Sequence, residues 1–185
     1  MVLITQSGAE TLSVGSPAPD FSLPATNGQT YSLSSFKDAK LLVISFTCNH
    51  CPYALGVEDR FIRLAKTYSS RGVSFVAISA NDAVKYPDDS FANMKARAEL
   101  KQYPFPYLYD EPQTTAKAYG AVCTPHIFVF DADRKLIYEG RIDDNWKDES
   151  AVKHHDLRDA LEAALNNRSV PSPQTNPMGC SIKWK

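Results

Sequence analysis

The sequence predicts a three-layer α/β sandwich, and three patterns in its 185 residues lead to this fold class. Two continuous apolar runs, 41–46 and 73–79, are typical of strands buried on both faces. A stretch with apolar residues at helical spacing, 53–72, separates them, so the three segments form a right-handed parallel βαβ unit. Two further strands within 126–142 are joined by a turn too short for a crossover and must be antiparallel. Parallel strands first and an antiparallel pair last, with helices between them, predict the sandwich.

Ahead of this unit, the sequence predicts a hairpin. Asn27-Gly28 lies between two short alternating runs, "DFSL" and "TYSL", and both residues tolerate the positive φ of a type I′ turn. The helix over 53–72 is expected to stop at Gly72, because glycine readily ends a helix in the left-handed conformation.

Beyond the second buried strand, shorter elements are predicted. A helix over 90–100 would take Asp88 or Asp89 as its N-cap. A short strand is expected within 105–110, and a short helix over 113–120 that ends at a glycine.

The chain is expected to end in an amphipathic helix and an extended arm. The helix is predicted over 149–167, with His154 and His155 on its solvated side. The proline-rich remainder has no helical period, so we expect one domain over 1–166 and an extended arm over 167–185.

Composition excludes several classes of partner. With 43% hydrophobic and 22% charged residues and a net charge of −1, the chain gives no electrostatic reason to expect nucleic acid or an anionic membrane. No apolar run approaches the roughly 18 residues of a membrane span. The first residues lack the basic region of a secretory signal, so a cytoplasmic address is expected, where thiols are mostly kept reduced.

The chemistry of the chain is predicted to lie in the C-x-x-C pair Cys48 and Cys51, which follows a buried strand and begins a helix. Free N–H groups and the helix dipole favour an anion at that place, so Cys48 should ionise more readily than a free cysteine. Its thiolate could attack a disulfide, and Cys51 could then resolve the mixed disulfide. His50 adds a donor or a positive charge beside the pair.

Three segments carry a resemblance to a known family: "GSPAPDFSL" with "NGQTYSLSSFK", "CNHC", and "CTPHIFVFD". Over 13–166 the chain resembles thioredoxin-fold redoxins, the group related to alkyl hydroperoxide reductases and to TlpA/ResA-type thiol–disulfide oxidoreductases. "CNHCPY" and "GCSIKW" together resemble a peroxiredoxin-like subgroup. The resemblance implies a thioredoxin-like fold, no cofactor, and electrons from a thioredoxin or glutathione system. It also implies that Cys123, Thr124 and the cis-proline candidate Pro125 bind substrate, with this segment presenting its backbone to the substrate chain by β-type pairing.

Departures from the family pattern bear on activity. Thr47 stands where thioredoxins have tryptophan, and His50 directly before the second cysteine is similar to the strongly oxidising DsbA pattern. Both are expected to tune the pair. The peroxiredoxin pattern P-x-x-x-T-x-x-C fits neither cysteine, and Pro125 stands where peroxiredoxins have their peroxide-binding arginine. A disulfide substrate is therefore favoured, with a thiol peroxidase as the alternative.

A metal site is a further alternative. Cys123 and His126 have ligand spacing, and with Cys48, Cys51 and either His126 or His50 they could bind zinc or copper.

The arm carries a fourth cysteine, Cys180, close to Ile182 and Trp184. We expect the arm to pack on the domain and to bury Trp184, because a solvated arm has little reason to carry large apolar residues. Cys180 could then act as a resolving cysteine toward Cys48 or Cys123.

Overall fold

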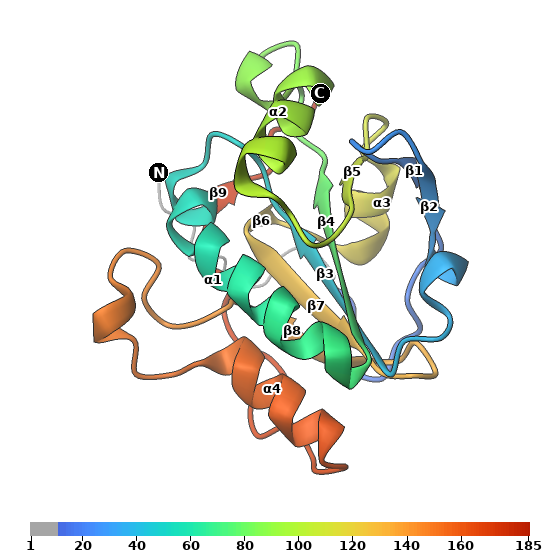
Figure 1. Cartoon of the computed structure of the whole chain (residues 1–185), viewed down its shortest axis with the longest axis vertical. Helices are drawn as coiled ribbons and strands as arrows, with labels where there is room; N and C mark the ends of the chain where they lie inside the picture. The colour runs from blue at the N-terminus through green and yellow to red at the C-terminus, as the bar shows by residue number, and fades with distance from the viewer. Residues whose placement is uncertain (1–10) are drawn as a thin grey trace.

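The computed structural model describes residues 11–185, and a five-stranded sheet lies at its centre (Figure 1). Its strands stand in the order β5-β4-β3-β7-β8. They span Leu41–Phe46 (β3), Val73–Ser79 (β4), Tyr107–Tyr109 (β5), His126–Phe130 (β7) and Leu136–Gly140 (β8). β3 pairs in parallel with β4 and antiparallel with β7, and β8 is antiparallel to β7. The parallel unit and the antiparallel pair expected from the sequence are confirmed.

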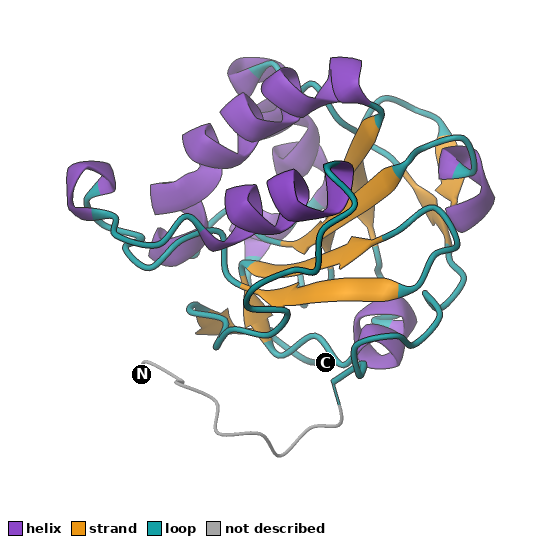
Figure 2. Ribbon diagram, turned by 90° about the horizontal axis from the view of Figure 1, so that it is seen from below, coloured by secondary structure: helices purple, strands orange, loops and turns teal. Residues whose placement is uncertain are grey.

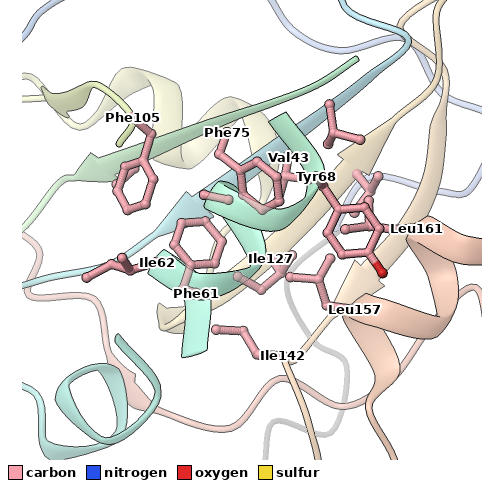
Figure 3. Close-up of a cluster of buried hydrophobic side chains, with 14 of the residues drawn as sticks. Val43, Phe61, Ile62, Tyr68, Phe75, Phe105, Ile127, Ile142, Leu157 and Leu161 are labelled. Atoms are coloured by element: carbon pink, nitrogen blue, oxygen red, sulfur yellow. The ribbon is translucent and has the colours of Figure 1, made fainter. Parts of the chain in front are cut away.

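Helices and a hairpin cover the two faces of this sheet (Figure 2). The remaining elements include Ser22–Pro24 (β1), Thr30–Ser32 (β2), Pro52–Tyr68 (α1), Phe91–Lys101 (α2), Thr114–Tyr119 (α3) and Asp156–Leu165 (α4). Helices α1, α2 and α4 pack on one face, where Phe61, Phe75 and Leu157 share a buried cluster (Figure 3). Helix α3 and the hairpin β1–β2 pack on the other, which completes three layers. Among the described residues, no helix is long and apolar enough to cross a membrane.

The hairpin forms, but its turn is not the expected type I′. That turn needs a positive φ at both central residues, and Gly28 has a φ of 82° whereas Asn27 does not adopt the positive region. Five residues, 25–29, connect the strands. The N–H of Thr26 donates to the carbonyl of Tyr107 at 2.9 Å, so contact with β5 holds the longer loop.

The last helix begins at Asp156 rather than at 149. A short 3₁₀ helix, Glu149–Ala151, comes first. The N–H of His154 then donates to Asp144 Oδ1 at 3.2 Å, which holds this segment outside the helix. His154 and His155 therefore precede α4 instead of lying on it.

The C-terminal arm packs on the domain, as expected. Its strand β9 (Cys180–Ser181) pairs antiparallel with β6 (Cys123–Thr124). Ile182 is 3% exposed, but Trp184 is 39% exposed, with the Lys117 ammonium 5.6 Å from its ring centroid. The expected burial of Trp184 is wrong, because Ile182 fills the apolar space and the indole stays at the surface beside a cation.

Candidate active site

The two cysteines of the motif lie where β3 leads into α1. Cys48 follows the end of β3 by two residues, and Cys51 is the N-cap of α1. Thr47, just before them, donates its N–H to β4 at 2.8 Å and lines a small pocket together with Pro125. The Thr124-Pro125 peptide bond is cis, as the resemblance implied.

Thr124 contacts both sulfurs through different atoms. Its Oγ1 lies 3.2 Å from Cys48 Sγ, and its carbonyl oxygen lies 3.1 Å from Cys51 Sγ. The hydroxyl can donate to a Cys48 thiolate, whereas the carbonyl can only accept from a Cys51 that keeps its proton. Cys48 is 4% exposed and Cys51 is 0% exposed, so a molecule arriving from solvent meets Cys48 first.

The two thiols share their ionisation. The hydrogen bond from Cys48, with smaller contributions from Cys180 and the Ala54 N–H, outweighs the effect of burial and lowers the pKa of Cys51 to about 5. The bond with Cys51, burial and the negative charge of Asp89 raise the pKa of Cys48. One proton is thus held between the two sulfurs, and the pair titrates as a unit.

The easy ionisation expected at Cys48 is therefore not favoured there, because the pKa of Cys48 is raised and that of Cys51 is lowered. Helix α1 begins after Cys51, so the first-turn N–H of Ala54 lowers the pKa of Cys51, whereas Cys48 lies three residues before the N-cap. The helix N-terminus favours a thiolate at Cys51. The carbonyl of Thr124 opposes that ionisation, because its hydrogen bond is lost when Cys51 loses its proton. The pair combines the more exposed thiol, Cys48, with a neighbouring sulfur, Cys51, that carries the negative charge at neutral pH.

A buried carboxylate, Asp89, stands beside the pair. It accepts hydrogen bonds from the Asn49 N–H at 2.7 Å, from His50 Nδ1 at 2.6 Å and from Asn81 Nδ2 at 2.8 Å. The ring of His50 stacks on Tyr86, with centroids 5.2 Å apart and planes inclined by 9°. These contacts fix the loop between the two cysteines and place one negative charge near Cys48.

Sequence reasoning misassigned Asp89 as a helix cap. The N-cap of α2 is Ser90, whose side chain accepts from the Asn93 N–H. Asp89 instead ends a short 3₁₀ helix, Pro87–Asp89, and turns its carboxylate toward the cysteine loop. The sequence did contain a signal that Asp89 lies near the cysteines, because the loop 80–89 follows β4, which runs parallel to β3. The carboxyl ends of parallel neighbours meet at one edge of a sheet, where ligand sites form.

The four-ligand metal set expected from the sequence does not assemble. His126 Nε2 donates to Glu139 Oε1 at 2.8 Å, and its Nδ1 accepts from the Val122 N–H at 3.4 Å, so both ring nitrogens are engaged. The Cys123 thiol donates to the Pro125 carbonyl at 3.6 Å, and burial raises the pKa of Cys123 to about 12.

A different group does converge. Within residues 11–185, Cys48, His50 and Asp89 each offer one ligand atom, and these atoms lie within 4.8 Å of one another. Thiolate, imidazole and carboxylate are zinc ligands. A metal there would replace the hydrogen bond between His50 and Asp89 and would occupy the Cys48 sulfur, so it would compete with redox use of the pair.

The arm brings the fourth cysteine to this site. Cys180 packs against the small cluster formed by Cys48, Cys51 and Ala54. Burial, followed by its hydrogen bond with Cys51, raises the pKa of Cys180 to about 12. The structure thus places Cys180 in contact with Cys51, and its expected role as a resolving cysteine toward Cys48 or Cys123 stays a prediction.

Known proteins are similar to this chain in sequence and in fold. The thiol-disulfide oxidoreductase ResA of Bacillus cereus is 27% identical over 133 residues, 72% of each chain. The chloroplastic peroxiredoxin Q of Triticum aestivum is 29% identical over 109 residues, 59% of this chain and 46% of that protein. The crystal structure of an uncharacterised conserved protein from Geobacillus kaustophilus matches with a TM-score of 0.89 at 46% identity, covering 95% of this chain and 94% of that one.

A more distant structure shows the fold. The thioredoxin domain of a thiol-disulfide oxidoreductase from Bacteroides vulgatus matches with a TM-score of 0.60 at 18% identity, over 70% of this chain and 89% of that one. This confirms the expected thioredoxin-like fold. A model of the Redoxin family matches residues 13–157, which confirms the expected oxidoreductase class at the level of the family. With its C-x-x-C pair at the helix start and its sequence matched over most of its length, the chain belongs to the Redoxin family.

Proposed function

We propose that this protein is a thiol–disulfide oxidoreductase in which Cys48 is the nucleophile and Cys51 the resolving cysteine. The observation that carries the proposal is the contact of Thr124 with both sulfurs at the start of α1, through its hydroxyl to Cys48 and its carbonyl to Cys51. With a pKa of about 5 at Cys51, the pair carries one negative charge at neutral pH, and transfer of the shared proton from Cys48 to Cys51 puts that charge on Cys48 when it reacts. Cys48, the more exposed sulfur, is then the nucleophile that a substrate meets.

The exchange runs in two balanced steps. The Cys48 thiolate attacks one sulfur of a disulfide, a mixed disulfide forms, and the other substrate sulfur leaves as a thiolate. That thiolate takes the proton from Cys51, which then attacks the Cys48 sulfur and releases the second substrate thiolate. The Cys48–Cys51 disulfide forms, the dithiol loses two electrons, and the substrate gains them. The hydroxyl of Thr124, 3.2 Å from Cys48 Sγ, stabilises the thiolate of Cys48 by donating a hydrogen bond.

His50 and Asp89 set the free-energy cost of a negative charge at the pair. Asp89 raises the pKa of Cys48 through its charge, and the hydrogen bond from His50 offsets part of that charge. We assign both as residues that tune the redox potential. A thioredoxin or glutathione system would return the disulfide to the dithiol, and the cytoplasmic address expected from the sequence remains a prediction.

Limited alkylation tests the roles of the two cysteines. A substoichiometric amount of iodoacetamide, added to the reduced protein at neutral pH, is expected to label Cys48 first, and the rate should fall only when the pH drops through about 5. Cys123, buried and with a pKa near 12, is the internal control and should stay unlabelled. Preferential labelling of Cys51 would reverse the two roles.

Two substitutions then separate the steps. Cys51→Ser is expected to accumulate a mixed disulfide at Cys48, because the resolving sulfur is gone. Cys48→Ser is expected to be inert toward the same disulfide. A Cys48→Ser variant that still reduced disulfides at the wild-type rate would refute the proposal.

A hydroperoxide is the second candidate substrate, because one relative is a peroxiredoxin. The Cys48 thiolate would attack the peroxide and become a sulfenic acid, which Cys51 would convert to the same disulfide with loss of water. Peroxide-dependent NADPH consumption, coupled through thioredoxin and its reductase, tests this activity. Peptide mapping without reductant after one equivalent of peroxide shows whether Cys180 also forms a disulfide with Cys51.

The remaining alternative is a metal at Cys48, His50 and Asp89, and the metal content of the purified protein tests it.

A further inference from the structure

The C-terminal arm occupies the backbone edge beside the two sulfurs. Strand β9 pairs antiparallel with β6, and Cys180 stands opposite Thr124 in the register. Thr124 is also the residue whose hydroxyl and carbonyl contact Cys48 and Cys51. The sequence implied that this edge presents its backbone to an extended substrate, but the arm of the same chain already pairs with it.

The arm fits this edge closely. A Cβ added to Gly179 would lie 2.1 Å from the carbonyl oxygen of Thr124, so only glycine allows the approach. Just past β9, the side chain of Ile182 is buried, and its N–H donates to the Val122 carbonyl at 3.2 Å. The arm is therefore packed on both sides of its short strand.

The end of the arm is anchored as well. The carbonyl of Lys183 accepts from the Asp82 N–H at 2.8 Å and from Gln113 Nε2 at 2.9 Å. The N–H of Lys183 donates to Asn81 Oδ1 at 2.8 Å, and the N–H of Lys185 donates to Gln113 Oε1 at 3.0 Å. An incoming peptide would have to break these bonds before it could pair with β6.

We propose that this built-in strand restricts the dithiol to small, flexible disulfides and excludes extended protein chains. The inference rests on the proposed function and names its substrate class. Extended peptides commonly bind by adding a strand to a free edge, and β9 holds the edge that lies beside the sulfurs. Cys48 is only 4% exposed, so a sulfur on a small, mobile molecule can align with it where a chain held in a folded protein cannot. A small disulfide RSSR oxidises Cys48 and Cys51 to their disulfide and leaves as two RSH.

The test compares two substrates on the pre-reduced full-length protein. Bis(2-hydroxyethyl) disulfide is the small probe and insulin is the protein probe. Each second-order rate constant is divided by that of dithiothreitol with the same probe, which corrects for intrinsic reactivity. We expect the normalised rate constant to be at least about 100-fold larger for the small probe, equivalent to roughly 2.7 kcal/mol in activation free energy.

Release of the arm should remove this preference. Gly179→Ala is expected to displace β9 and to raise the normalised insulin rate about tenfold, while the small-probe rate stays within about twofold. Ser181→Ala, in the same strand but without a clash, is the matched control and should keep the wild-type preference. Ile182→Ser loosens the arm by a second route if Gly179→Ala fails to fold. Hydrogen exchange at the Cys180 amide verifies that the arm is released.

The outcomes are distinguishable. Equal normalised rates for both probes in the wild type would leave the proposed function intact and overturn the substrate restriction. A released arm that leaves the preference unchanged would overturn it too. If neither probe is reduced, the proposed function itself fails, and this inference falls with it.

Discussion

Two histidine–carboxylate pairs lie within residues 11–185, and one of these two borders the redox site. His50 Nδ1 and Asp89 Oδ2 are 2.6 Å apart, and His126 Nε2 and Glu139 Oε1 are 2.8 Å apart. The His50 side chain is 22% exposed, whereas that of His126 is fully buried. Two histidine–carboxylate hydrogen bonds of nearly equal length therefore lie in different surroundings, and those surroundings give the two pairs different roles.

The buried pair connects structural elements. His126 begins β7 and Glu139 lies in β8, and Gln174 from the C-terminal arm donates to the same carboxylate at 2.9 Å. The pair of His50 and Asp89 instead acts on a reactive group, because the charge of Asp89 raises the pKa of Cys48. The comparison teaches that distance from the sulfurs and access to solvent, and not the pair itself, separate a tuning residue from a structural one.

The largest effect is expected where the buried pair is broken. His126→Ala leaves the Glu139 carboxylate buried without its main partner, so we expect a loss of about 3 kcal/mol in the free energy of unfolding. Urea denaturation measures it. His126→Gln is the matched control, because its amide can still donate to Glu139 and should recover part of the loss. A loss equally large for His50→Ala would contradict the distinction between the two pairs.

Asp89→Asn should shift the redox potential instead. The substitution removes a negative charge that opposes ionisation of Cys48 but keeps an oxygen that can accept from His50. The reduced, anionic pair is then stabilised, so the protein becomes more oxidising, by about 30 mV for roughly 1.4 kcal/mol. Equilibration with glutathione gives the midpoint. A midpoint that moves to more reducing values would show that hydrogen bonding, not charge, dominates the effect of Asp89.

His50→Ala should move the midpoint in the opposite direction and by less. Without the bond at 2.6 Å, the Asp89 carboxylate is less compensated and destabilises the anionic pair more strongly. The protein becomes less oxidising, and the same glutathione equilibration measures the change. A midpoint unchanged within roughly 5 mV would make His50 a spectator.

The fold was predictable because its signals are local. The continuous apolar runs of β3 and β4 admit one interpretation, and both strands have the predicted bounds. The start of α4 was not predictable, because Asp144, which lies outside the helical pattern, accepts a hydrogen bond from the N–H of His154. The cysteine pair and the cis-proline were read from the sequence, but the partner of His50 was not. Asp89 looked like a helix cap because its neighbour Ser90 is one, and only the packing of the β4 loop against the cysteine loop brings it to His50.

The position of Cys180 was also hidden from the sequence. The arm was expected to dock, yet its register against β6 decides which sulfur the thiol meets, and no local pattern fixes that register. With Cys180 opposite Thr124, its thiol contacts Cys51, the sulfur that carries the negative charge of the pair. Cys180 therefore stabilises a negative charge on the cysteine pair, whereas Asp89 destabilises it.

The smallest expected effect follows from this contact. Cys180→Ala removes one hydrogen bond to the Cys51 thiolate, so the pKa of Cys51 should rise from about 5. Because such a bond contributes about 1 kcal/mol, the rise should be under about one pKa unit. The sign is testable through the pH at which alkylation of the pair reaches half its maximum rate, which should move upward. Cys180→Ser keeps a donor at the same place and should stay near the wild-type midpoint. Equal upward shifts in both variants would mean that Cys180 acts by excluding water from the pair, and a downward shift in Cys180→Ala would show that the thiol opposes the charge of Cys51.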